Sequence, residues 1–368
     1  MIPRKTELLA PARDYDAGRA AVDFGADALY IGAPRFGARV AAGNSVDDIA
    51  RLVAYGRRFG VRTYATLNTL IYEDELAAAE AQARELIAAG VDALIVQDMA
   101  YMRMGLSGVE LHASTQTHNV TPEGVRFLDA CGFSRVILER GLTLEQIHAI
   151  RAGSSVALEA FVHGAICVGY SGRCFLSRTM SPRSGNRGEC AQPCRLPYDL
   201  TDAQGRVLAA GKHLLSLRDM DLSAHLAGLL DAGVDSFKIE GRLKDISYVK
   251  NTVAHYRRAL DSAMAAAGGF GRASAGRSVY DFEPDPARTF SRGATAYFVG
   301  GKAPGVAEFT TPKATGVYIG RVARVAGGSF ILDGGAGSGA TGLAPGDGIC
   351  FVAPCGAMLG TSVNAAEG

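Results

Sequence analysis

Four cysteines are clustered in the middle of this chain, with the spacing C-x6-C-x15-C-x3-C: Cys167, Cys174, Cys190 and Cys194. Thiolates bind soft metals. A structural zinc site usually shows two close pairs, each separated by about two to four residues, and only the second pair here fits. A [4Fe-4S] cluster tolerates looser spacing, because its four ligands need only surround it. We interpret the cysteines as ligands of a [4Fe-4S] cluster, with zinc or inert thiols as alternatives.

The remaining cysteines form no second group. Cys131 lies at a predicted helix end and is expected to pack in a core, while Cys350 and Cys355 lie near the C-terminus without a neighbouring histidine or pair. The total of seven is odd, and the first residues lack the apolar segment of an export signal. Both observations argue against a disulfide framework and favour a metal or redox site.

Polar side chains end many of the short apolar segments that we expect to be strands. In a parallel barrel these ends meet on one rim, where barrel enzymes carry their active sites. Ionisable side chains are rarely buried without a partner, so several on one rim indicate a site. The alternative is that each residue only caps a strand or helix. The predicted catalytic residues are Glu159, His163, Glu240 and His112, and the predicted substrate-binding residues are Arg140, Arg242, Lys238 and Gln97.

The cysteine segment is also rich in arginine. Five arginines lie between residues 165 and 197, and Glu189 is the one acid among them. Guanidinium groups bind phosphates and carboxylates in a two-point geometry. We therefore predict that Arg178, Arg183 and Arg187 bind substrate, with a solvated basic loop as the alternative.

Short apolar segments alternate with stretches of helical period along most of the chain. Several of these helices begin at Ser, Thr or Asp and end at glycine. Eight such units predict an α/β fold, a parallel (β/α)8 TIM-like barrel, with a doubly wound open sheet as the alternative. The predicted strands are 7–12, 27–32, 62–68, 92–98, 109–115, 134–140, 156–164 and 235–241, and the predicted helices include 45–60, 74–90, 121–132, 143–153, 218–233 and 245–268.

The seventh unit departs from this repeat, because a long cysteine-bearing insertion follows its strand. The insertion holds the cluster region 163–197 and a hairpin-like segment 198–211, and loops of this length are usually functional or disordered. Beyond the last helix the composition shifts to glycine, proline and β-branched residues. We predict a barrel domain over 1–268 and a small β-barrel-like domain over 269–368, in which the glycine-rich segment 334–342 connects a hairpin.

Composition limits the function classes. The chain has 368 residues, 48% hydrophobic and 20% charged, with a formal net charge of +1. No apolar run approaches the ~18 residues of a membrane span, so we expect a cytoplasmic protein with no membrane partner. Because the net charge is small, any RNA contact must come from a local cationic patch.

The stretch "EAFVHGAICVGYSGRCFLS" at 159–177 resembles the signature of peptidase family U32. Further similarity, in "LHASTQ", "ILER" and "FKIEGRLKDISYVKN", extends it over about residues 7–315. Despite the family name, the better-understood branches resemble oxygen-independent hydroxylation proteins that act on RNA pyrimidines or on the ubiquinone ring. In those branches the matching four cysteines hold a [4Fe-4S] cluster, and for the RNA branches the resemblance implies prephenate as the hydroxyl donor.

"EGRLKDISYVKN" and "FSRGATAYFVGG" are most similar to the branch that hydroxylates a cytidine of 23S rRNA, with the tRNA uridine branch next. The resemblance therefore implies RNA and prephenate, or a similar small carboxylate, as partners. The sequence does not indicate the electron partner.

Proteolysis is the main alternative function. The chain has no HExxH motif, and "GYSG" is not a GxSxG nucleophile elbow. The two alternatives that stay open are a U32-type peptidase or collagenase with a structural metal site, and a subunit in ubiquinone-ring hydroxylation.

Overall fold

The computed structural model describes residues 3–39, 43–333, 343–353 and 358–366. Cys355 and the predicted connection 334–342 lie outside these residues. Eight parallel strands form a closed barrel, because β11 pairs with both β1 and β7. The predicted barrel is confirmed and the open sheet is excluded. The barrel strands are β1 (Arg4–Ala12), β2 (Ala28–Gly32), β3 (Arg62–Leu67), β4 (Ala93–Val96), β5 (Glu110–Ala113), β6 (Arg135–Ile137), β7 (Ala157–Ala165) and β11 (Ser236–Ile239).

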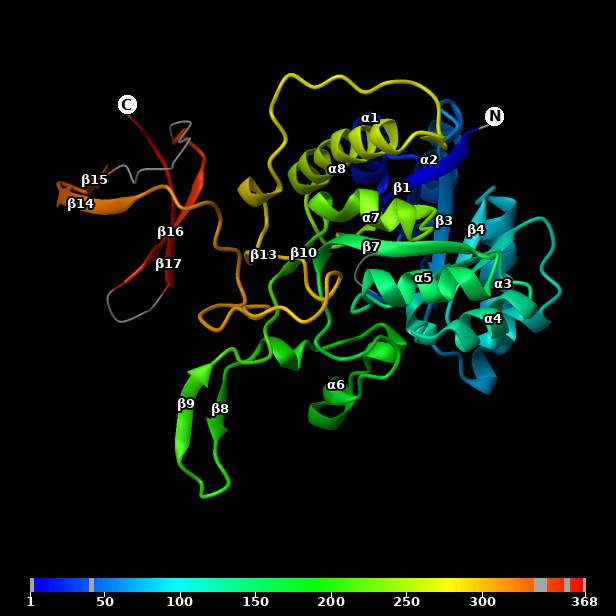
Figure 1. The fold of residues 1–368 in the computed structure, drawn as a ribbon, viewed down its shortest axis with the longest axis horizontal. Helices are drawn as coiled ribbons and strands as arrows, with labels where there is room; N and C mark the ends of the chain where they lie inside the picture. Colours follow the sequence, from blue (N-terminus) through cyan, green and yellow to red (C-terminus); the bar gives the residue numbers. More distant parts are fainter. Residues whose placement is uncertain (1–2, 40–42, 334–342, 354–357, 367–368) are drawn as a thin grey trace.

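Helices surround the barrel (Figure 1). Polar caps fix where they begin: for example, Ser45 accepts a hydrogen bond from the N–H of Asp48, and Thr143 from that of Gln146. No helix in the described part of the chain is long and apolar enough to cross a membrane. The helices around the barrel are α1 (Tyr15–Asp23), α2 (Val46–Arg57), α3 (Leu76–Ala88), α4 (Pro122–Ala130), α5 (Leu144–Gly153), α7 (Leu226–Asp231) and α8 (Ile246–Ala267).

The helix predicted over 218–233 is only partly correct. Its first residues form the short strand β10 (Asp219–Asp221), which pairs antiparallel with the end of β7. This is possible because β7 is nine residues long and its last residues offer free backbone groups. Arg292 then binds the carboxylate of Asp219 at 2.9 Å. The rest of the predicted helix is present as a 3-10 turn at Ser223–His225 followed by α7 from Leu226 to Asp231.

The insertion after β7 lies on one side of the barrel (Figure 1). It contains the short helix α6 (Leu176–Met180) and the hairpin of β8 (Tyr198–Thr201) and β9 (Val207–Lys212). The hairpin confirms the prediction for 198–211.

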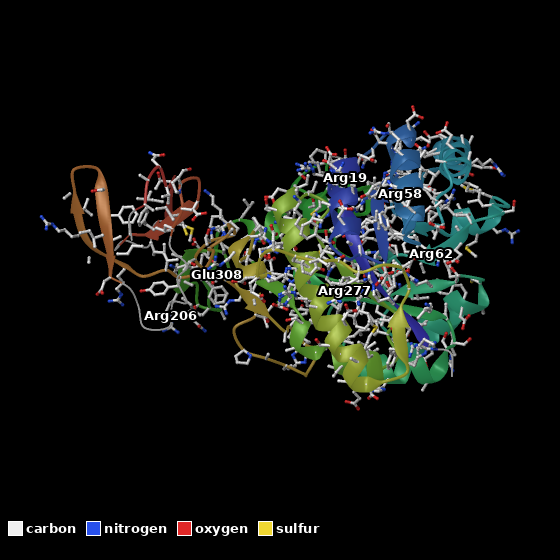
Figure 2. All side chains as sticks on the ribbon, turned by 90° about the horizontal axis from the view of Figure 1, so that it is seen from above. Arg19, Arg58, Arg62, Arg206, Arg277 and Glu308 are labelled. Carbon is white, nitrogen blue, oxygen red and sulfur yellow. The ribbon has the colours of Figure 1, made fainter. Side chains whose placement is uncertain are left out.

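The chain beyond α8 first returns to the barrel. Strand β12 (Phe270–Arg272) pairs with β1, and β13 (Ala294–Thr295) pairs with β10. Two antiparallel hairpins follow, β14 with β15 and β16 with β17. Both views show them beside the barrel, and Figure 2 shows side chains dense in the barrel and sparse around these hairpins. The hairpin strands are β14 (Arg321–Ala326), β15 (Ser329–Asp333), β16 (Gly348–Val352) and β17 (Met358–Ser362).

Candidate active site

Glu240 marks the mouth of the barrel, directly after β11. Its carboxylate is held by two arginines: Arg39 Nη2 lies 2.9 Å from Oε1, and Arg140 Nη2 lies 3.1 Å from Oε2. Burial alone would raise the pKa of Glu240, but the two guanidinium groups lower it to about 2. Glu240 is therefore ionised at neutral pH.

A third guanidinium lies in the same mouth. Arg242 is buried and donates from Nη1 to Thr66 Oγ1 at 2.7 Å, so its side chain reaches from β11 to β3. Among the described residues, Nε of Arg242, Nε of Arg140 and Oε1 of Gln97 are buried without a hydrogen-bond partner. Buried polar groups normally have partners, and a bound ligand or water supplies them where the protein does not.

The mouth therefore carries an excess of positive charge. Three guanidinium groups lie near two carboxylates, those of Glu240 and Glu139, and Arg140 also lies 3.7 Å above the ring of Phe161. Guanidinium groups bind carboxylates well, because their donors match the two oxygens. The arrangement fits a small anion such as a carboxylate.

Arg39 is the mouth residue that the sequence analysis missed. It follows β2 and has a positive φ of 65°, an uncommon backbone conformation for a residue other than glycine. Its N–H donates to the carbonyl of Gly188 at 3.1 Å, which joins this loop to the cysteine insertion. The only sequence signal was a basic residue in the glycine-containing segment "APRFGAR" after a predicted strand.

Glu159 lies inside the barrel and not on its rim. It is fully buried, with Lys238 Nζ 2.8 Å from Oε1 and Arg135 Nη1 3.0 Å from Oε2. Ser236 also donates to Oε2, and Arg135 continues to Glu7 at 2.5 Å. Burial raises the pKa of Glu159, but Lys238 and Arg135 together bring it below its usual value. This side chain belongs to a paired internal network, and its expected place on the rim is wrong.

His112 lies in the same interior. Its Nε2 is 3.1 Å from Glu110 Oε2, and the Tyr64 ring is 4.8 Å away between centroids. Burial, followed by the charge of Arg135, lowers the pKa of His112 to about 4. The expected rim position is wrong here too, because His112 points inward from within β5 and does not follow its end.

His163 points out of the barrel. Its Nδ1 lies 3.3 Å from the hydroxyl of Tyr256 on α8, and burial lowers its pKa to about 4. The cause is a register shift: Lys238 pairs with Phe161 and the next residue, Ile239, pairs with His163. Two residues of β7 therefore oppose one of β11, and this bulge reverses the side-chain alternation that placed His163 inside.

The cysteine insertion is fastened over the mouth by hydrogen bonds. Glu139, at the end of β6, accepts from the N–H of Ser171 at 2.9 Å, and Gln116 accepts from the N–H of Gly172 at 3.0 Å. Gly172 has φ 71°, and a Cβ there would lie 1.9 Å from the Gln116 carbonyl oxygen. Only glycine fits this close approach.

The insertion brings the four predicted ligand cysteines into one region. Burial raises the pKa of the Cys194 thiol, and the negative charges of Cys167, Cys190 and Cys174 raise it further. Cys167 lies two residues beyond the end of β7, whose Gly164 packs against the backbone of Glu240 at the mouth. Burial raises the pKa of the Cys167 thiol, and the nearby charges of Arg140 and Arg39 oppose that effect.

The cysteine thiols are available as ligands of soft metals. Every cysteine in the described part of the chain is free. In the same part, no three His, Cys, Asp or Glu side chains are close enough for a single metal ion. The N–H of Gln192 donates to Cys190 Sγ at 3.3 Å, the kind of hydrogen bond to sulfur that tunes a cluster. Thiolates are the ligands of iron–sulfur clusters, so these four side chains have the chemistry that such a cluster requires.

The family is shown by comparison with known proteins. Residues 13–307 match the profile of peptidase family U32. The chain belongs to this family. The resemblance drawn from residues 159–177 is thereby confirmed.

Three U32 relatives are similar over most of this chain. A 23S rRNA 5-hydroxycytidine C2501 synthase of Escherichia coli (strain K12) is 49% identical, over 88% of this chain and 49% of that protein. A tRNA hydroxylation protein P1 of Bacillus subtilis (strain 168) is 36% identical, over 71% and 64%. A collagenase of Porphyromonas gingivalis (strain ATCC BAA-308 / W83) is 32% identical, over 70% and 66%. This chain thus spans about half the length of the first relative and under two thirds of the other two.

The arginines of the cysteine insertion differ in whether a carboxylate neutralises them. Arg187 donates from Nη1 and Nη2 to the carboxylate of Glu75, at 2.8 and 2.6 Å, so an acid from outside the insertion neutralises its charge. Arg183 donates to the carbonyls of Glu189 and Cys190, and Arg178 to that of Pro182. Those two guanidinium groups are exposed and have no carboxylate partner among the described residues.

Proposed function

We propose that this chain carries an iron–sulfur-dependent, oxygen-independent hydroxylase of a pyrimidine in RNA, with a 23S rRNA cytidine as first candidate and a tRNA uridine as second. The similarity to the rRNA 5-hydroxycytidine synthase and to the tRNA hydroxylation protein supports the substrate class. The observation that carries the proposal is the position of Cys167, two residues beyond the end of β7, beside the arginine-rich mouth.

The four cysteines Cys167, Cys174, Cys190 and Cys194 are the proposed ligands of a [4Fe-4S] cluster. When bound, such a cluster supplies one-electron redox or Lewis-acid chemistry next to the mouth. Arg39 and Arg140 form ion pairs with Glu240, and their charges also act on the Cys167 thiol, so they would lie close to both proposed groups.

The mouth is the proposed binding site of the hydroxyl donor. Prephenate is a dicarboxylate, and Arg39, Arg140 and Arg242 provide guanidinium groups for both of its carboxylates. The unpartnered Nε atoms of Arg140 and Arg242 are donors that an anion can satisfy. Cluster and donor would then lie on either side of the same arginines.

Glu240 is proposed to position these arginines. A general base works best with a pKa near the working pH, and the pKa of Glu240 is about 2. The carboxylate is therefore a poor proton acceptor at neutral pH. Its two ion pairs instead keep Arg39 and Arg140 aimed into the mouth.

The reaction needs an electron acceptor. The reaction replaces a C–H bond of the base by C–OH. When the hydroxyl comes from a group at the oxidation level of water, this replacement releases two electrons and two protons. We propose that two equivalents of a one-electron carrier accept these electrons, one at a time, through the cluster.

Product analysis tests this function. A strain that lacks its own rRNA cytidine hydroxylase receives this chain or its Cys167→Ser variant, and nucleosides from 23S rRNA and tRNA are measured by mass spectrometry. We expect 5-hydroxycytidine with the unchanged chain and none with the variant, while Cys131→Ser serves as the matched control and retains the product. Absence of hydroxylated pyrimidine with the unchanged chain, in both RNAs, refutes the proposal.

One relative, the collagenase of Porphyromonas gingivalis, favours a second candidate, a U32-type peptidase with a structural metal site. Gelatin cleavage by anaerobically purified protein that contains zinc and no iron would support it over the RNA hydroxylase.

A further inference from the structure

Three large aromatic side chains are exposed around the cysteine insertion. Tyr72, Tyr170 and Phe175 have relative exposures of 60%, 63% and 61%, and we call these three residues the aromatic ledge. Removing each ring from water would lower the free energy, so a group of aromatic rings exposed to solvent indicates a binding site.

Hydrogen bonds join the two loops that carry the ledge. The N–H of Leu70, two residues before Tyr72, donates to the carbonyl of Asn186 at 3.0 Å. The amide of Asn186 in turn donates to the carbonyl of Gly172, two residues after Tyr170, at 3.2 Å. The loop after β3 and the cysteine insertion therefore form one continuous surface beside the barrel mouth.

Neighbouring side chains hold two of the rings in place. The guanidinium of Arg187 lies 4.3 Å from the centre of the Tyr72 ring, and Glu75 fixes that guanidinium by two hydrogen bonds. The rings of His118 and Tyr170 are in edge contact at 5.1 Å. The rings are thus oriented before a ligand arrives, which lowers the entropy cost of binding.

Cationic side chains accompany the rings. Arg173 lies between Tyr170 and Phe175 in the chain, is exposed, and has no ion-pair partner among the residues that the structure describes. Arg178 and Arg183 follow with guanidinium groups bound only to backbone carbonyls. Planar rings next to cations without carboxylate partners match the bases and phosphates of a nucleic acid.

We propose that the aromatic ledge, with Arg173, Arg178 and Arg183, binds the single-stranded RNA that flanks the target base. This inference rests on the proposed function and deepens it. Bases stack on aromatic rings regardless of sequence, and arginines neutralise the phosphates between them. The surface borders the mouth, because the insertion that carries Tyr170, Phe175 and the three arginines also carries Cys167 directly after β7. A base displaced from the bound strand therefore has a short path to the proposed site.

Fluorescence anisotropy with a labelled single-stranded RNA of about ten nucleotides tests the ledge. Tyr170→Leu and Phe175→Leu remove the stacking surface but keep an apolar side chain. Each is expected to weaken binding by about 5- to 150-fold, the range for loss of one stacked base. Tyr170→Phe keeps the ring and is expected to bind as the unchanged chain does. Phe127→Leu on α4, where the ring is 61% exposed, is the matched control away from the ledge.

Salt dependence separates the rings from the arginines. Arg173→Gln should reduce the slope of log affinity against log salt by about 0.7, the value for one phosphate of a single strand, while the leucine variants leave the slope unchanged. The leucine variants should also keep the thermal midpoint of the unchanged chain, because the rings are exposed.

Photocrosslinking of the unchanged chain to a 5-bromouridine RNA gives a second measurement that does not depend on variants. We expect crosslinked peptides from residues 163–197 or from the segment with Tyr72. Crosslinks only elsewhere, or equal RNA affinity for Tyr170→Leu, Phe175→Leu and Phe127→Leu, overturn the ledge. If the unchanged chain still produces hydroxylated pyrimidine in cells, only the ledge falls; if it neither binds RNA nor forms product, the proposed function falls with it.

Discussion

Replacing Glu159 by glutamine separates a structural role from a catalytic one. Glutamine has nearly the same shape, so the change removes the charge and little volume. Arg135 and Lys238 would remain buried with Glu7 as the nearest remaining carboxylate partner of the network. Breaking a buried ion pair from one side typically costs about 3–5 kcal/mol, because a charge is left uncompensated. We expect a loss of that size in the free energy of unfolding.

Chemical and thermal denaturation measure this loss. A decrease of about 3–5 kcal/mol corresponds to a fall in the thermal midpoint of roughly 6 to 20 °C for a domain of this size. Glu80→Gln is the matched control, since Glu80 pairs with Arg84 on the surface of α3, and exposed pairs contribute about 0–1 kcal/mol. Adding Lys238→Met to Glu159→Gln should recover part of the stability, because it removes one of the uncompensated cations.

One result would refute this reasoning. Suppose that the free energy of unfolding of Glu159→Gln is within about 1 kcal/mol of that of the unchanged chain, and that the variant retains its iron but forms no hydroxylated product. Glu159 would then act in the reaction, and its role would not be to stabilise the interior network.

Four further predictions follow from the structure. Cys174→Ser should lose most of the iron of anaerobically purified protein while Cys131→Ser retains it; equal loss in metal analysis would contradict the ligand assignment. Arg39→Gln should raise the KM for the carboxylate donor by about tenfold with kcat less affected, as steady-state kinetics would show. Gly172→Ala should loosen the insertion and increase its protease sensitivity, because the added Cβ overlaps a carbonyl. Burial lowers the pKa of His163 to about 4, so this histidine is neutral in the folded protein at neutral pH. As the pH falls, the unfolded chain binds a proton at His163 before the folded protein does. Stability should therefore fall from about pH 6.5 to pH 4, and urea titrations of His163→Phe should show a smaller fall.

The barrel could be predicted from the sequence because each of its strands is a short apolar run between helices. Glu240, Arg140 and Arg242 were placed correctly at the mouth, since they directly follow strands and their side chains continue to the end of the barrel. The cysteine loop was evident from its spacing.

The wrong predictions have a common physical cause. Each concerns a position or a pairing that is set by contacts between segments far apart in the chain. The bulge that turns His163 outward arises from the pairing of β7 with β11. Glu159 and His112 sit too deep in their strands to reach the rim, and sequence does not show depth. Glu75 neutralises Arg187 across two loops more than 100 residues apart in the chain, as their separation of 112 shows.

The charged interior of the barrel also has a consequence for how the strands align. In a closed sheet, sliding one strand by two residues preserves which side chains point inward, so an inward apolar pattern alone does not forbid the slip. Here a slip of β7 by two residues in one direction would move Glu159 away from Lys238, and a slip in the other direction would move it away from Arg135, so either slip leaves a buried charge without its partner. The ion pairs of the interior therefore favour one shear of the barrel, that is, one offset of strand register around the closed sheet. The same register brings Glu240 level with Arg140 at the mouth.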